Sequence, residues 1–262
     1  MKNLYMKTII ISDLHNRVDW VELALSSPLL KPYDNVIFLG DYFDDFNDTP
    51  EDVSNSAKWL KQSLSKPNRI HLYGTHDIWY RFPDNPFIQA SGNTEEKSNA
   101  INHTLTTKDW DLLKLYHYEQ DFLLTHAGVH SYLINKYAFE NKLSIQGEII
   151  NRIVKPATEK ALIDVSNNRP NEWLDAGFAR GGMQVVGGIT WLDWDDEFEP
   201  VPELSQIVGH TQLRYPGEKI TENSKNYCLD TKNKHIGILE NGIFTYIEID
   251  KLKDDFGTKG TQ

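Results

Sequence analysis

Short apolar runs in this sequence lead into side chains that bind metals or transfer protons. The first run ends at Asp13 and His15, and the second ends at Asp41, with Asp44 three residues later. In an extended segment residues i and i+2 point the same way, so Asp13 and His15 can hold one ion together. A carboxylate at a glycine-marked turn, such as Asp41, can approach closely enough to bridge two ions.

Three later runs supply further groups of the same kind. The stretch "GTHD" places Thr75, His76 and Asp77 after a glycine, while "THAG" carries His126 and "GHTQ" carries His210. Oxygen and imidazole ligands without thiolate suit Mn, Fe or Zn better than Ca, Mg alone or Cu. Two such ions, about 3.5–4 Å apart, form a clamp for in-line displacement at phosphorus. The pattern therefore predicts a centre of two divalent metal ions, with Mn as the first choice.

The ligand-type side chains can lie close together only if the apolar runs before them are strands of the same sheet or of two sheets packed together. The predicted strands are residues 7–12, 35–40, 69–74, 122–128 and 206–210. Helical patterns at 18–26 and 51–65 lie between the first three, and Thr49-Pro50 supplies a cap and a first-turn proline for the second helix. Strand, helix and strand at this spacing predict βαβ crossovers with parallel pairing.

The C-terminal part has a different pattern. Three short apolar segments, at 227–231, 234–240 and 243–249, are joined by turn residues that include the hairpin signal Asn241-Gly242. We expect an antiparallel meander that closes a second sheet. The fold class is therefore α/β with mixed sheets, followed by a frayed polar tail at 253–262.

Composition narrows the function classes. The formal net charge of −11 counts against a nucleic-acid-binding surface, because phosphate backbones are bound by clustered Lys and Arg. No apolar run approaches the roughly 18 residues of a membrane helix. Cys228 is the single cysteine, which favours the cytoplasm as the compartment. Since no linker interrupts the chain, we expect one domain over residues 1–252.

Taken together, "SDLHN", "GDYFDD", "GTHD", "THAG" and "GHTQ" resemble the five ordered motifs of the calcineurin-like metallophosphoesterases. The order and approximate separations match from residue 8 to residue 212. The residues of these motifs are most similar to those of the serine/threonine protein phosphatase and symmetrical dinucleoside-tetraphosphatase branch. The resemblance implies a four-layer αββα sandwich with a dinuclear site at the carboxyl ends of its strands.

The resemblance also implies a role for each motif residue. The metal ligands it implies are Asp13, His15, Asp41, Thr75, His126 and His210. A metal-bridging hydroxide would attack phosphorus. His76 would protonate the leaving oxygen, and Asp44 would orient His76 and favour its charged form. Asp77 is either a hydrogen-bond partner or a solvated turn residue.

Two departures from the family pattern concern the substrate and the second metal. Asp45 stands where the phosphatases have a phosphate-binding arginine, so that clamp is missing or comes from elsewhere, with Arg81, Arg180 and Arg214 as possible replacements. Thr75 stands where the family has asparagine, and its hydroxyl is a poorer ligand than an amide carbonyl. Natural divergence with altered activity, a laboratory substitution and divergence to a binding role all remain open.

The long segment between His126 and His210 admits two interpretations. It holds a helical stretch near 144–166 and an acidic, Trp-rich stretch. Residues 137–204 are either outer-layer helices with a solvated loop or a cap that shapes the substrate cleft. In the second case Trp191 and Trp194 are available to stack on a ring.

The leading functional hypothesis is hydrolysis of phosphomonoesters by an enzyme similar to the serine/threonine phosphatases. Its substrate would be a phosphoprotein or a nucleotide, and hydrolysis of a dinucleoside polyphosphate is the second hypothesis. A third, of another class, is a weakly active or inactive metal-binding module that binds a partner. The presence of both His76 and Asp44, which have no structural duty obvious from sequence, favours an enzyme.

Overall fold

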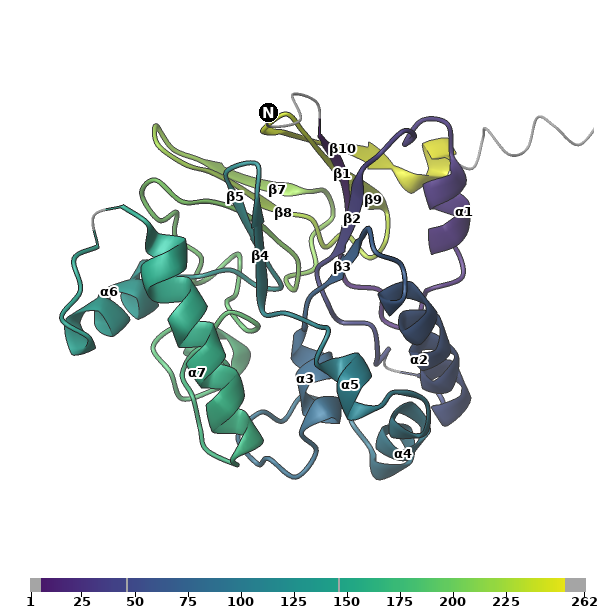
Figure 1. The fold of residues 1–262 in the computed structure, drawn as a ribbon, viewed down its shortest axis with the longest axis horizontal. Helices are drawn as coiled ribbons and strands as arrows, with labels where there is room; N and C mark the ends of the chain where they lie inside the picture. The colour runs from purple at the N-terminus through teal and green to yellow at the C-terminus, as the bar shows by residue number, and fades with distance from the viewer. Residues whose placement is uncertain (1–5, 46, 146, 253–262) are drawn as a thin grey trace, which may run out of the picture.

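The computed structural model describes residues 6–45, 47–145 and 147–252. Within these residues two mixed sheets pack against each other, and helices lie on their outer sides (Figure 1). The α/β class and the sandwich architecture are thereby confirmed. Among the described residues no helix combines the length and apolarity needed to cross a membrane. The tail expected at 253–262 lies outside the described residues.

The first sheet contains the strands of the first three motifs. Its strand order is β10-β9-β1-β2-β3, with bounds β1 (Lys7–Ile11), β2 (Asn35–Phe38), β3 (Arg69–His71), β9 (His235–Glu240) and β10 (Ile243–Glu248). β1 pairs with β2 and β2 with β3 in parallel, as the spacing predicts. The carboxyl ends of these three strands therefore lie at one edge of the sheet.

The second sheet contains the strands of the last two motifs. Its order is β4-β5-β6-β8-β7, with bounds β4 (Tyr116–Glu119), β5 (Phe122–Thr125), β6 (Ser205–Val208), β7 (Gly217–Ile220) and β8 (Lys225–Cys228). β5, β6 and β8 are parallel neighbours, whereas β4 and β7 are antiparallel edge strands that the sequence pattern does not reveal.

The expected C-terminal meander is wrong in its sheet assignment. β8 joins the second sheet beside β6, while the hairpin of β9 and β10 pairs with β1 in the first sheet. The hairpin itself forms as expected, since Asn241 and Gly242 both have positive φ angles. The residues of a turn are a local signal. Which sheet a hairpin joins depends instead on where the apolar face of the hairpin becomes buried.

Alternate residues of the central strands face two different layers. Ile10 of β1 and Ile37 of β2 belong to a cluster with Leu124 and Ile207, which fills the space between the sheets. Ile9 and other alternate side chains belong to the cluster that includes the helices. Both sets are almost fully buried, which is the pattern of parallel strands covered on both faces.

The helices lie on the outer faces of the two sheets and along one edge of them (Figure 1). Their bounds are α1 (Val21–Ser26), α2 (Pro50–Leu64), α3 (Thr75–Arg81), α4 (Glu95–Thr104), α5 (Thr107–Trp110), α6 (Ser131–Glu140) and α7 (Lys155–Ser166). Thr49 caps α2 in a reciprocal bond with Asp52, as Thr49-Pro50 predicts. The helix expected at 18–26 begins only at Val21, and the stretch expected near 144–166 starts as a π-helical turn at Ile150–Val154.

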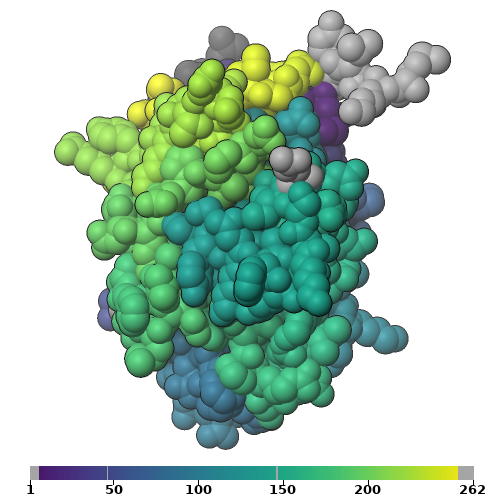
Figure 2. Space-filling view, turned by 90° about the vertical axis from the view of Figure 1, so that its left-hand side faces the viewer, coloured from purple at the N-terminus to yellow at the C-terminus, as the bar shows by residue number. Residues whose placement is uncertain are grey.

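The segment at 137–204 covers the second sheet. α7 lies within it, and Figure 1 places α6 and α7 on the side opposite to α1 and α2. Figure 2 shows this face, on which the teal and green residues of α6, α7 and the following loops form a continuous surface. A short 3-10 turn, η2 (Phe178–Arg180), belongs to these loops.

Candidate metal centre

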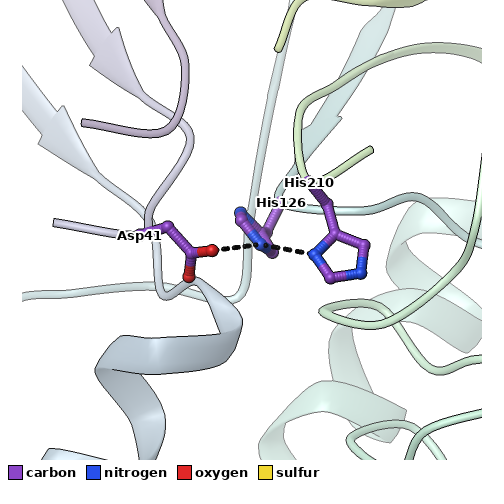
Figure 3. A group of neighbouring side chains, drawn as sticks. All are labelled: Asp41, His126 and His210. Atoms are coloured by element: carbon purple, nitrogen blue, oxygen red, sulfur yellow. Dashed lines mark hydrogen bonds and ion pairs between the residues drawn. The ribbon is translucent and has the colours of Figure 1, made fainter. Parts of the chain in front are cut away.

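The predicted ligands come together where parallel strands of both sheets end. The ligand atoms of Asp13, His15 and Asp41 all lie within 4.8 Å of one another, and those of Asp41, His126 and His210 do the same. Asp41 belongs to both groups, and Figure 3 shows it facing the two histidines of the second group. One carboxylate is therefore shared between two adjacent sets of ligands.

The carboxylate of Asp41 lies between two imidazoles. Its Oδ2 atom is 3.8 Å from Nε2 of His15 and 3.3 Å from Nε2 of His126. Its Oδ1 atom accepts the backbone N–H of His76 at 2.9 Å. The geometry leaves Oδ2 as the oxygen that faces both groups.

A glycine allows this close approach. Gly40 has φ +101°, and a Cβ atom there would lie only 2.3 Å from the backbone nitrogen of Gly74. The ends of β2 and β3 can therefore touch only because both residues lack a side chain. Asp41, which follows Gly40, is thereby held beside the start of α3.

Backbone carbonyls orient the rings of two histidines. Nδ1 of His15 lies 2.7 Å from the carbonyl oxygen of Asp44, and Nδ1 of His126 lies 2.9 Å from that of Leu39. A carbonyl only accepts hydrogen bonds, so each Nδ1 carries a proton, and each ring turns its Nε2 toward Asp41, where that atom can bond a proton or a metal ion. Metal-binding histidines are commonly oriented in this way.

The second group needs a cation. Nε2 of His126 faces Nδ1 of His210 at 3.1 Å. Burial would lower the pKa of His126, but the carboxylates of Asp41 and Asp13 raise it to about 10. Burial and the charges of His126 and Arg180 hold the pKa of His210 well below its usual value. Two nitrogens and a carboxylate in this arrangement fit either a proton or a divalent metal ion.

The first group has a similar demand for positive charge. Asp13 is almost fully buried and accepts hydrogen bonds from the hydroxyl of Ser12 and from the backbone N–H of His210. Burial favours the neutral form of Asp41, but the nearby histidines, His126 first, hold its pKa well below the usual value. The residues present therefore fit two divalent cations with oxygen and imidazole ligands.

Thr75 lies beside the second group. Its hydroxyl donates a hydrogen bond to the carbonyl oxygen of Thr190 and lies 3.4 Å from Nδ1 of His210. The hydroxyl hydrogen of Thr75 is therefore engaged in this bond, while the lone pairs of its hydroxyl oxygen can still bind a cation. Thr190 belongs to the segment at 137–204, which therefore reaches the centre.

His76 and Asp44 form the predicted pair. Nδ1 of His76 lies 3.1 Å from Oδ2 of Asp44. Burial would lower the pKa of His76, but Asp41 and Asp44 raise it above its usual value, which favours the imidazolium. The sequence does not reveal that Tyr80 and Lys97 both bond Oδ1 of Asp44, at 2.6 and 3.1 Å.

Asp77 is a buried hydrogen-bond partner, and the alternative of a solvated turn residue is wrong. Its side chain is fully buried and accepts the backbone N–H groups of Asp41, Tyr42 and Gly74 at 2.7, 2.9 and 2.8 Å. Burial and the charge of Asp41 raise the pKa of Asp77 to about 7. Asp77 thus joins the loops that follow β2 and β3.

The five arginine and tryptophan candidates lie in different places. Arg180 pairs with Asp193 at 2.7 Å and bonds the hydroxyl of Thr211, next to His210. Trp191 lies edge-on to His210, with 5.9 Å between the ring centroids.

Arg214 is instead exposed and lies over the ring of Tyr215, while Arg81 pairs with Asp111. Trp194 is a buried core side chain and is not available to stack on a substrate.

A cavity of about 130 Å³ opens beside His15 and His76. It exceeds the roughly 10–15 Å³ that one water needs, so it can hold a larger group. Sequence reasoning missed three charged residues of its lining, Arg17, Asp230 and Lys232. Asp230 follows strand β8, just as Asp41 follows strand β2. An aspartate after the apolar run "YCL" could therefore have indicated a residue of the site.

The chain resembles known proteins in its sequence pattern and in its fold. The model of a family described as calcineurin-like phosphoesterase matches residues 6–212. No curated protein sequence matches the chain. The structure is similar to the cold-active protein-tyrosine phosphatase of a psychrophilic Shewanella species, with a TM-score of 0.57, 16% identity, and coverage of 94% of this chain and 78% of the other.

A protein serine/threonine phosphatase from Saccharomyces cerevisiae gives a TM-score of 0.47 at 13% identity, with coverage of 93% of this chain and 80% of the other. At these identities the comparisons concern the fold alone.

Proposed function

The chain belongs to the calcineurin-like phosphoesterase family, and on that basis we propose that it hydrolyses phosphomonoesters with two divalent metal ions. The observation that carries the proposal is the position of Asp41, whose Oδ2 atom faces ligand groups on both sides. A shared carboxylate is what two ions at close distance require. Mn is our first choice of metal, with Fe or Zn as alternatives, because the ligands are carboxylates and imidazoles.

We propose the following division of labour among the residues. Asp13, His15 and Asp41 would hold one ion, and Asp41, His126 and His210, with Thr75 as a neutral neighbour, would hold the other. When bound, such ions polarise phosphoryl oxygens and lower the pKa of water.

His76, in its charged form, donates its proton to the leaving oxygen. Asp44 keeps the ring oriented and favours the imidazolium, and the bonds from Tyr80 and Lys97 hold Asp44 in place.

The segment at 137–204 is proposed as a cap over this centre. Thr190 accepts the hydrogen bond of Thr75, and Trp191 lies edge-on to His210. Arg180 reaches Thr211, the residue after His210. These contacts support a role for Trp191 and Arg180 at the substrate cleft, while the position of Arg214 over Tyr215 gives it no such support.

We favour a phosphoprotein over a nucleotide as the substrate. The similar Shewanella protein is described as a protein-tyrosine phosphatase, and the overall charge of −11 would repel a polyphosphate chain.

A substrate screen tests the proposal. The protein would be assayed on p-nitrophenyl phosphate, its bis ester, phosphopeptides and a dinucleoside tetraphosphate, each with Mn, Mg, Zn or no metal. We expect metal-dependent release of phosphate from the monoesters, and much less from the bis ester. Asp41→Asn is the control, because it removes the shared charge. Hydrolysis that is equal with and without metal, or equal in the variant, would contradict the proposal.

A further inference from the structure

Arg17 lines the cavity that also contains the predicted ligand His15 and the predicted proton donor His76. Among the arginines of the described residues, Arg17 is the one that lines this cavity. A phosphate group beside two metal ions still presents oxygens on its outer side, and a guanidinium is well suited to bind them because its N–H groups form a planar fork.

The backbone of Arg17 is fixed relative to the metal centre. The N–H groups of Leu14 and His15 both bond the carbonyl oxygen of Asp41 at 2.9 Å, and the N–H of Asn16 bonds that of Tyr42 at 2.9 Å. The loop after β1 is thus joined to the loop that carries Asp41. The backbone of Arg17 therefore has a fixed position with respect to the ligands.

The side chain of Arg17 is oriented by a carboxylate. Its Nη2 atom lies 2.5 Å from Oδ2 of Asp45, and the two side chains are 32% and 43% exposed. Since a guanidinium has five N–H donors, this contact through one nitrogen leaves donors for an anion in the cavity. Asp45 occupies the position at which the resemblance expects an arginine, and here it meets an arginine supplied by another loop.

We propose that Arg17 binds the phosphate group of the substrate, held toward the cavity by Asp45. The inference rests on the proposed function, since it assigns a residue to the same centre. Lys232, exposed at the rim of the same cavity, adds positive charge nearby. The positive charge that the phosphatases carry after the second motif is in this chain placed after the first.

Inorganic phosphate is the probe. Its inhibition constant against p-nitrophenyl phosphate hydrolysis and its dissociation constant by calorimetry would both be measured on the Mn-loaded protein. In Arg17→Ala both constants should rise on the order of tenfold to a hundredfold, the loss expected for hydrogen bonds between charged groups. The Mn content should not change, because Arg17 is not a ligand.

Two control variants separate phosphate binding from a structural ion pair. Asp45→Ala removes the carboxylate that orients Arg17 but keeps the guanidinium, so both constants should rise, by no more than about threefold. Arg169→Ala breaks another Arg–Asp pair, with Asp164 at 2.7 Å on α7, and should leave them unchanged. Equal losses in Arg17→Ala and Asp45→Ala, or no loss in Arg17→Ala, would overturn the inference.

Failure of the inference and failure of the proposed function give different results. Suppose that the wild-type protein hydrolyses monoesters and that Arg17→Ala binds phosphate as tightly as the wild type. Then only the assignment of Arg17 is wrong. If the wild-type protein hydrolyses nothing, the proposed function is wrong. Calorimetry with phosphate then still tests Arg17, because loss of binding in Arg17→Ala supports the anion site and unchanged or absent binding overturns it.

Discussion

Replacement of Asp77 tests whether one buried carboxylate holds the metal centre together. In Asp77→Ala the backbone N–H groups of Asp41, Tyr42 and Gly74 lose their acceptor. A buried donor left without a partner costs about 1–3 kcal/mol, so three give about 3–9 kcal/mol as an upper range. The removed carboxylate was itself repelled by Asp41, which offsets part of the loss. We expect a decrease of about 3 kcal/mol in the free energy of unfolding.

Asp77→Asn separates the hydrogen bonds from the charge. Its amide oxygen can take the place of Oδ2, which accepts the N–H groups of Asp41 and Gly74. Its amide nitrogen would then face the N–H of Tyr42, so one bond is lost. We expect a decrease of about 1–2 kcal/mol, between the wild type and Asp77→Ala.

Urea unfolding of the chelator-treated protein measures these differences, because bound metal would add its own stabilisation. Asp111→Ala is the control. Asp111 also pairs through its carboxylate, with Arg81, but its side chain is 62% exposed, so the change should stay within about 0.5 kcal/mol. A loss in Asp77→Ala no larger than that in Asp111→Ala would refute the structural role of Asp77.

The remaining predictions concern the centre itself. Asp41→Asn should lower the Mn content below the about two ions expected per chain, and unchanged content would rule out a shared ligand. His76→Asn should reduce turnover by roughly 10²–10⁴ for a poor leaving group and much less for p-nitrophenyl phosphate; equal losses, or loss of metal, would argue against proton donation. Thr75→Asn should lower the Mn concentration for half-maximal activity, since the amide can donate to Thr190 and still offer its carbonyl oxygen to the ion. No shift in that concentration would place Thr75 outside the ligand set. Chelation should abolish activity and Mn should restore it, whereas activity that persists in the chelator would exclude a metal enzyme.

The strand ends of the centre could be predicted because their signals are local. A short apolar run followed by glycine and a ligand-type side chain marks the position of Asp41 or His126 without any knowledge of the partners. Parallel pairing then follows from the spacing of the elements, and it brings these ends to one edge. The family resemblance rests on the same local stretches.

Other parts of the centre depend on contacts between distant residues. The donors that bond Asp77 include Asp41 and Tyr42, which are 36 and 35 positions away, so its burial is not visible in "GTHD". Lys97 reaches Asp44 across 53 positions, and Arg17 reaches Asp45 across 28. The motifs do not specify these particular contacts, and the residues meet through the packing of the loops.

The loops after β2 and β3 position the main groups of the centre with only a few residues. Gly40 and Gly74 let the two backbones touch, and Asp77 then bonds N–H groups on both sides of that contact. The N–H of His76 bonds Asp41 directly. A bridging carboxylate and a proton donor are therefore positioned by one compact unit, in which a change at any member displaces both. This coupling predicts that substitutions of Gly40 or Gly74 impair metal binding and proton donation together.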